Sequence, residues 1–228
     1  MLEDAYRQGL VPRNVAVGVT RVASSHQSLD TFTPGEVKEF LSKVDVDDRL
    51  AHAWHLALTG LRRGEIAGLR WSDVDLEART LCVMNNRVSA GGRSVENDPK
   101  SATSRRTLPM PERLVVALRD AHDRQRVERS EAGSAYRSGS YVVSNEVGDP
   151  YSPAVLSRYW REALARVGMR HLKLHGARHT AATLMHLDGV PTAVTAAYIG
   201  HNDPALTTRL YAHSQDDALR AAADSLQH

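Results

Sequence analysis

The sequence contains a single cysteine, Cys82, in 228 residues. One cysteine allows no disulfide within the chain, and it excludes zinc modules that are built from several cysteines. No run of apolar residues approaches the length of a membrane span, and the N-terminus lacks a basic-then-apolar signal pattern. These absences predict a cytoplasmic protein without a membrane partner.

Several catalytic motifs are also missing. The sequence has no G-x-S-x-G, no P-loop and no G-x-G-x-x-G, so serine-triad hydrolysis and nucleotide-dependent chemistry are disfavoured. His175 and His179 lie four residues apart, but Gly176 stands where a zinc protease needs glutamate. No paired Asp/Glu pattern indicates a two-metal nuclease. We therefore expect no metal, no nucleotide and no other cofactor.

The net charge of +2 does not indicate a class of partner, but the charged residues are distributed unevenly along the chain. Residues 30–50 hold six acidic and three basic side chains, whereas residues 158–178 hold six basic side chains and one acidic. Residues 87–106 hold five basic and two acidic side chains. Two basic segments far apart in the sequence can converge on one face that binds a polyanion. The alternative at this point is an ordinary solvated surface.

Helices are predicted over most of the chain. A short helix and a polar linker account for residues 1–28, and "TFTPGEVKEFL" then starts a helix with Thr33 as N-cap, Pro34 at the first position and Glu36 completing a capping box. Further helices are expected at 49–60, 62–70, 111–129, 152–168, 175–190, 191–200, 203–213 and 214–227.

The apolar period changes between residues 79 and 110. "RTLCVMNNRVS" is typical of one strand, "AGGR" of a turn and "SRRTLPM" of a later strand, with a polar loop at 94–103 between them. "YVVS" at 141–144 predicts a short strand or an extended piece. The fold class predicted is mainly α with a small antiparallel β-sheet of about three strands (α+β).

Arginine and histidine recur in local contexts that are unusual for surface charges. "TGLRRGE" places Arg62 at a helix junction, "LHGARHT" places His175 and Arg178 on one helical face, and "IGHNDP" places His201 in a turn. Only Glu65 is acidic within these motifs. Such a cluster, if buried together, needs an anion, and arginine binds phosphate with two parallel hydrogen bonds. Taken one at a time, each motif still fits separate surface charges.

The order of these motifs resembles the catalytic domain of tyrosine recombinases, the phage-integrase family. The matching stretches are "TGLRRGEIAGLRW", "DPKSATSRRTLPMP", "LHGARHTAAT" and "YIGHNDPALTTRLYAH", and the resemblance covers roughly residues 31–226. The resemblance implies a DNA breaking–rejoining fold. It also implies the following catalytic residues, with Glu65 as a supporting acid: Arg62, Lys100, His175, Arg178, His201 and Tyr211.

Some positions depart from the family pattern. Gly176 and Ala177 stand where an acidic and an aliphatic residue are frequent, and Ile199 stands where leucine is frequent. Residues 1–28 look like only the last helix and linker of the core-DNA-binding domain that family members carry, and residues 29–228 like the catalytic domain with a C-terminal helix. The chain therefore resembles a fragment, a truncated gene or a reduced recombinase.

The resemblance implies that Tyr211 attacks a DNA phosphate and forms a 3′-phosphotyrosyl link without metal or ATP. His175 would share the tyrosine proton, Arg62 and Arg178 would neutralise the phosphate oxygens, and Lys100 would protonate the 5′-oxygen. His201 would donate to a non-bridging oxygen.

Contacts to double-stranded DNA are expected from Arg105, Arg106 and Lys173 and from backbone amides near Thr180, and a homotetramer is expected on DNA. Two other functions stay open: a non-catalytic DNA-binding remnant and a type IB topoisomerase-like activity.

Overall fold

The computed structural model describes residues 2–18, 30–90, 93–97, 105–137 and 139–200. The first range contains helix α1 (Leu2–Arg7) and the 3-10 helix η1 (Val15–Gly18), and α1 buries none of its side chains. The boundary predicted between residues 28 and 29 falls outside the described residues. None of the helices in the described ranges is long and apolar enough to cross a membrane.

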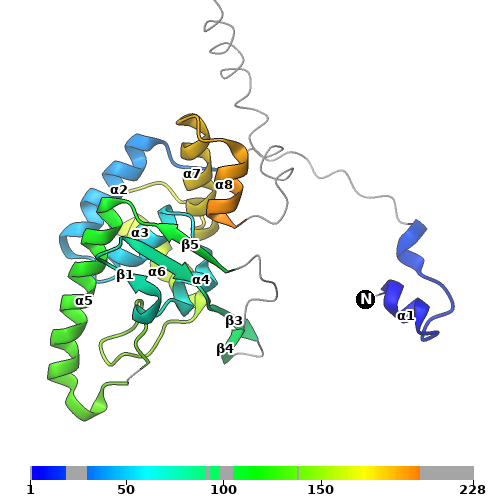
Figure 1. The fold of residues 1–228 in the computed structure, drawn as a ribbon, viewed down its shortest axis with the longest axis horizontal. Helices are drawn as coiled ribbons and strands as arrows, with labels where there is room; N and C mark the ends of the chain where they lie inside the picture. The colour runs from blue at the N-terminus through cyan, green and yellow to red at the C-terminus, as the bar shows by residue number, and fades with distance from the viewer. Residues whose placement is uncertain (1, 19–29, 91–92, 98–104, 138, 201–228) are drawn as a thin grey trace, which may run out of the picture.

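The main body is helical, with a small sheet inserted after its third helix. The helices before the sheet are α2 (Pro34–Asp47), α3 (Ala51–Leu58) and α4 (Arg63–Gly68). Those after it are α5 (Glu112–Ala132), α6 (Pro153–Arg166), α7 (Leu174–Leu187) and α8 (Thr192–Ile199). Figure 1 shows α7 and α8 side by side at one end of the body, and the long α5 along another side. The predicted mainly α organisation is confirmed.

Local signals set the helix starts. The hydroxyl of Thr33 accepts from the Glu36 N–H at 3.2 Å, and the Glu36 carboxylate accepts from the Thr33 N–H at 2.7 Å. This is the capping box that the sequence predicts, with Pro34 at the first helical position. Ser152 caps α6 in the same way, because its hydroxyl accepts from the Val155 N–H at 3.3 Å.

The three-stranded antiparallel sheet has the order β1-β2-β5, with β1 at Val74–Asp75, β2 at Thr80–Val83 and β5 at Arg106–Pro109. Leu81 lies opposite Leu108, and both side chains are buried. A separate two-stranded sheet joins β3 (Asn86–Ala90) to β4 (Arg93–Asn97), and Figure 1 shows this hairpin projecting from the body.

The prediction of one strand over residues 79–89 is therefore wrong. The chain leaves β2 after Val83 and resumes as β3 at Asn86, because Asn85 lies against α4: a Cβ on Gly68 would be 3.3 Å from the Asn85 carbonyl. The loop predicted at 94–103 begins with β4 instead. Its polar residues have low strand propensity, and antiparallel pairing with β3 overrides that propensity.

One cluster of aromatic side chains packs between the helices. Trp160 on α6 packs edge-on against Phe40 at 4.9 Å and against Trp54 at 5.5 Å between ring centroids. All three rings are almost completely buried. Phe32 joins them, and its N–H donates to the Thr180 hydroxyl on α7 at 3.0 Å. Burial of large aromatic rings is a major stabilising contribution, so this core fixes α2, α3, α6 and α7 relative to one another.

The "YVVS" segment forms no strand. Tyr141 makes a single antiparallel bridge to Arg70, and Ser144 makes one to Pro150, with bends at Val142 and Val143 between them. Val142 and Val143 are fully buried in the same core. The prediction of a short strand is therefore wrong.

Candidate active site

The site begins at the first turn of α4. Glu65 is the third helical residue, and its Oε2 accepts from the Arg62 backbone N–H at 2.8 Å while its Oε1 accepts from Arg62 Nη1 at 2.8 Å. Glu65 is only 5% exposed, whereas the Arg62 side chain is 39% exposed. The carboxylate therefore anchors an arginine whose guanidinium still reaches solvent.

Arg106, on β5, holds the same carboxylate from the other side. Its Nη1 and Nη2 donate to Oε1 and Oε2 of Glu65, each at 3.0 Å. Burial acts most strongly on Glu65 and raises its pKa, but the hydrogen bonds and charges of Arg106 and Arg62 outweigh burial, so the net pKa is lowered. The buried Glu65 is thus ionised at neutral pH.

The same arginines hold the C-terminal end of α8. Arg106 Nε donates to the Tyr198 carbonyl at 2.9 Å, and Arg62 Nη2 donates to the Gly200 carbonyl. The Tyr198 hydroxyl in turn donates to the Pro109 carbonyl on β5 at 3.0 Å. The chain therefore reaches residue 200 beside Arg62.

Helix α7 contributes Arg178 and His175, which are three residues apart. Arg178 is 2% exposed, and its Nη1 donates to the Gly60 carbonyl at 2.7 Å. His175 is exposed, and its ring contacts that of His179 edge-on at 4.6 Å. Partial desolvation, followed by the charges of Arg178, Arg62 and Arg63, lowers the pKa of His175. At neutral pH its imidazole is therefore neutral and can accept a proton.

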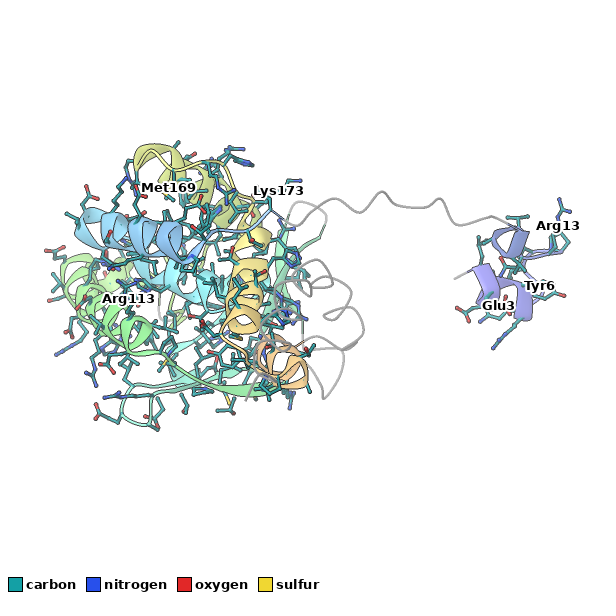
Figure 2. All side chains as sticks on the ribbon, turned by 90° about the horizontal axis from the view of Figure 1, so that it is seen from above. Glu3, Tyr6, Arg13, Arg113, Met169 and Lys173 are labelled. Atoms are coloured by element: carbon teal, nitrogen blue, oxygen red, sulfur yellow. The ribbon has the colours of Figure 1, made fainter. Side chains whose placement is uncertain are left out.

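A basic groove of about 860 Å³ runs from Arg62 to His175, between α4, β3, α6 and the start of α7. None of its lining residues is acidic. Lys173, the N-cap of α7, lies on one wall, and Figure 2 shows it on the opposite side of the view from Arg113 on α5. The basic side chains of the lining are Arg62, Arg63, Arg87, Arg161, His171, Lys173 and His175.

The groove brings basic side chains of the two segments together, and its binding of a polyanion stays a prediction. Arg87 comes from the first segment, whereas Arg161 and Lys173 come from the second. The individual roles of Arg63, Arg87 and Arg161 were not predicted from the sequence. The charge count of residues 87–106 and 158–178 was the signal available for two of them, but it does not tell which side chains face the groove.

Two predicted DNA contacts need correction. Arg106 donates from Nε, Nη1 and Nη2 to the Tyr198 carbonyl and the Glu65 carboxylate, so its guanidinium is engaged inside the protein. Thr180 lies inside α7 and is fully buried, so its backbone amide does not reach the surface; its hydroxyl donates to the Gly176 carbonyl at 2.9 Å and accepts from the Phe32 N–H. Both side chains hold elements of the fold together. Lys173 and Arg105 are exposed, as DNA contacts need to be, but their contact with DNA stays a prediction.

Three of the predicted catalytic residues, Lys100, His201 and Tyr211, lie outside the described residues. The structure therefore brings together Arg62, Glu65, Arg178 and His175 of the predicted set. Within the described ranges, no group of three or more His, Cys, Asp or Glu side chains is arranged to hold a metal ion.

Comparison with known proteins gives consistent results. The model of the phage integrase family matches residues 31–218. A protein named "Tyrosine recombinase XerC-like" from Caldanaerobacter subterraneus subsp. tengcongensis is 31% identical over 198 residues, which are 81% of this chain and 50% of that protein. An integrase of Saccharopolyspora erythraea is 34% identical over 136 residues, covering 60% of this chain and 31% of that protein.

Solved structures share the fold. The Tn1549 transposon integrase (residues 82–397), in complex with circular intermediate DNA, superposes with a TM-score of 0.75 at 22% identity, covering 98% of this chain and 76% of that one. The XerA recombinase gives a TM-score of 0.65 at 23% identity, covering 90% of this chain and 67% of that one. The chain spans about half the length of the first curated relative and a third of the second.

Proposed function

The chain belongs to the phage integrase family, and on this premise we propose that it is the catalytic part of a site-specific DNA recombinase. Its substrate is double-stranded DNA, which it cuts and rejoins through a 3′-phosphotyrosyl intermediate. The observation that carries the proposal is the placement of Arg62, Arg178 and His175 together, with Arg62 and His175 lining a groove that has basic but no acidic walls.

The proposed reaction exchanges one phosphodiester for another. The Tyr211 hydroxyl oxygen bonds to phosphorus while its proton passes to His175, which is neutral at pH 7. The bond from phosphorus to the 5′-oxygen breaks, and that oxygen takes a proton from Lys100. The products are a 3′-phosphotyrosine and a free 5′-hydroxyl. A 5′-hydroxyl of the partner strand reverses these steps, so the energy of the bond is conserved and no ATP is consumed.

Charge neutralisation is the main task of the arginines. As phosphorus becomes five-coordinate, negative charge grows on its non-bridging oxygens, and donors that are already in place lower the barrier most. The partly exposed guanidinium of Arg62, anchored by Glu65, is suited to this role. Arg178 and His201 supply the remaining donors in the proposal.

Double-stranded DNA as substrate and an assembly on it complete the proposal. The Tn1549 integrase was solved with transposon-end and circular intermediate DNA, and the λ integrase as a dimer bound to a core site. Exchange between two duplexes cuts four strands, and one tyrosine serves each cut. We therefore propose a homotetramer on two paired sites, with the groove residues holding the phosphate backbone.

Trapping of the covalent intermediate tests the function. The 228-residue chain is incubated with a library of nicked duplexes whose core is randomised, because a nick lets the cut fragment diffuse away and leaves the protein attached. We expect a DNA-linked band on a denaturing gel, whose sequenced DNA gives a common site. The Tyr211→Phe variant should retard the same DNA on a native gel but give no such band.

Other outcomes would assign another function. Retardation of DNA by the wild-type chain without any covalent band would make it a DNA-binding remnant. A covalent band together with relaxation of supercoiled plasmid, but no joining between two duplexes that carry the trapped site, would indicate a type IB topoisomerase-like activity. A covalent band formed by the Tyr211→Phe variant would show that the nucleophile is another residue.

A further inference from the structure

Arg106 makes three internal contacts that join β5, α4 and α8. Both of its terminal nitrogens donate to the Glu65 carboxylate at 3.0 Å, and Nε donates to the Tyr198 carbonyl at 2.9 Å. Its side chain is 9% exposed. A guanidinium used in this way recognises the protein's own carboxylate in a bidentate manner, a geometry that lysine cannot reproduce.

Each carboxylate oxygen of Glu65 accepts two hydrogen bonds. Oε1 accepts from both Arg62 Nη1 and Arg106 Nη1, whereas Oε2 accepts from Arg106 Nη2 and from the Arg62 backbone N–H. The guanidinium of Arg62 is thereby limited to one oxygen of the carboxylate. Its second terminal nitrogen donates to the Gly200 carbonyl instead of to Glu65.

The charges of this group do not cancel. One carboxylate stands between two guanidinium groups, so Arg62, Glu65 and Arg106 together carry one positive charge. Without Arg106, the buried Glu65 would be neutralised by Arg62 alone, and the pair would have no net charge. The positive potential at the Arg62 end of the groove would then be largely lost, because an interaction between charges is strong where water is excluded.

We propose that Arg106 is a positioning residue of this site: it neutralises Glu65 so that the charge of Arg62 stays available for the DNA phosphate, and it holds the end of α8 beside Arg62. The proposal rests on the strand-transfer function proposed above. It replaces direct DNA contact as the role of Arg106. Since β5 begins six residues after Lys100 in the chain, the same side chain also fixes the strand that follows that lysine.

A pair of compensating substitutions tests this role. Arg106→Gln leaves Arg62 as the one guanidinium that neutralises Glu65, and we expect the single-turnover rate of covalent adduct formation at saturating DNA to fall roughly 100-fold, in the range seen when one electrostatic donor is lost. Adding Glu65→Gln removes the carboxylate and restores the net charge of +1. The double variant should therefore react within about tenfold of the wild type and faster than either single variant.

Arg106→Lys separates charge from geometry. Lysine keeps the positive charge but cannot bridge both carboxylate oxygens and the Tyr198 carbonyl. Its rate should lie between those of the wild type and Arg106→Gln. In all variants the dissociation constant for DNA should change less than the rate, because Arg106 does not touch DNA.

Two results would overturn the proposal. The first is that Arg106→Gln lowers both the DNA affinity and the salt dependence of binding, and does so equally with Glu65 and with Glu65→Gln. Arg106 would then contact DNA directly. If the losses of the two single variants multiply in the double variant, then Arg106 only stabilises the fold.

The thermal unfolding midpoint provides a readout that does not depend on catalysis. Arg106→Gln removes the two hydrogen bonds that Arg106 donates to the buried Glu65 carboxylate, and Glu65→Gln leaves Arg106 buried without that carboxylate, so each single variant should unfold at a lower temperature than the double variant. This order of midpoints together with an inactive wild-type chain would refute the strand-transfer function and leave the charge pairing intact. Additive midpoints would refute the pairing itself.

Discussion

The buried guanidinium of Arg178 donates a 2.7 Å hydrogen bond to the carbonyl of Gly60, which is 118 residues earlier in the chain. Gly60 follows α3 with a φ of +100°, and a Cβ at this position would lie 3.1 Å from Cγ2 of Ile199 on α8. Glycine thus allows the end of α3, α7 and α8 to meet at one point. This junction sets where Arg178 lies relative to Arg62, two residues after Gly60.

A second close approach lies four residues further on, at Gly64, and leads to the first prediction. A Cβ on Gly64 would be 2.0 Å from Oδ1 of Asn86 and 2.6 Å from the Arg87 carbonyl, so Gly64→Ala must push β3 away from α4. We expect the free energy of unfolding to fall by about 1–3 kcal/mol, measured by urea denaturation. Gly35→Ala is the matched control: its Cβ meets only Thr33 Oγ1 at 3.9 Å, and helix propensity should raise stability by about 0.5–1 kcal/mol. Equal effects of the two substitutions would contradict the steric argument.

The salt dependence of DNA binding tests the groove. Lys173 is exposed at the N-cap of α7 and lines the groove, so Lys173→Ala should lower the slope of log K against log salt by about one unit. Fluorescence anisotropy measures the slope over a range of about 50 to 200 mM salt, where phosphate contacts change the affinity strongly. Arg113→Ala removes an exposed charge from α5, which lies outside the groove lining, and should leave the slope unchanged. Equal slopes for both variants would exclude this groove as the DNA surface.

The lowered pKa of His175 predicts a pH dependence of the reaction. A general base works only in its deprotonated form, so the rate of adduct formation should rise with pH to a plateau. The midpoint of this rise should lie below the ordinary histidine pKa of about 6.5. Single-turnover rates at subsaturating DNA report this midpoint for the free protein. His175→Gln should lower the rate by roughly 10²–10⁴-fold and abolish the acid limb. His171→Gln, an exposed neighbour in the same groove, should retain it; loss of the limb in both would remove His175 from the role.

Lys100 is predicted to protonate the leaving oxygen, and a change of leaving group tests this. Lys100→Ala should slow covalent cleavage more than it weakens DNA binding. A substrate with sulfur in place of the bridging 5′-oxygen should largely restore cleavage by that variant, because a thiolate, with a thiol pKa of about 8.5, leaves without prior protonation. Adduct yield on denaturing gels compares the two substrates. Equal losses on both would show that Lys100 does not act as the acid.

His52 makes stability depend on pH in a region away from the groove. It is buried, its Nε2–H donates to the Val142 carbonyl at 3.0 Å, and burial followed by the charge of Arg124 lowers its pKa to about 3. The unfolded chain binds a proton at His52 below about pH 6.5, whereas the folded protein does so only near pH 3, so stability should fall with decreasing pH between these values. Near pH 5 the contribution is about 1.4 kcal/mol per pH unit. His52→Gln should remove this part of the dependence of the unfolding free energy on pH, measured by urea denaturation at about pH 7, 6 and 5. If the unfolding free energies of the two proteins fall in parallel with decreasing pH, the prediction is contradicted.

The local features of the fold could be predicted from the sequence. The capping box of Thr33 and Glu36, the Ser152 cap and the helices that carry the site depend on neighbours three or four residues apart. The order of all six motif positions along the chain was likewise sufficient to identify the family: Arg62, Lys100, His175, Arg178, His201 and Tyr211. These features are encoded within a few residues or in the order of short motifs, so one sequence contains the information needed.

Contacts between distant segments could not be predicted in this way. The break between β2 and β3 results from packing against α4, and β4 forms because β3 offers a partner. Arg106 looked like a surface charge beside Arg105, yet Glu65, 41 residues earlier, holds it inside the domain. Whether an arginine meets DNA or a buried carboxylate depends on which segments the hydrophobic core brings together. Local sequence determines which elements form, whereas tertiary packing decides which charges are buried and which remain in the groove.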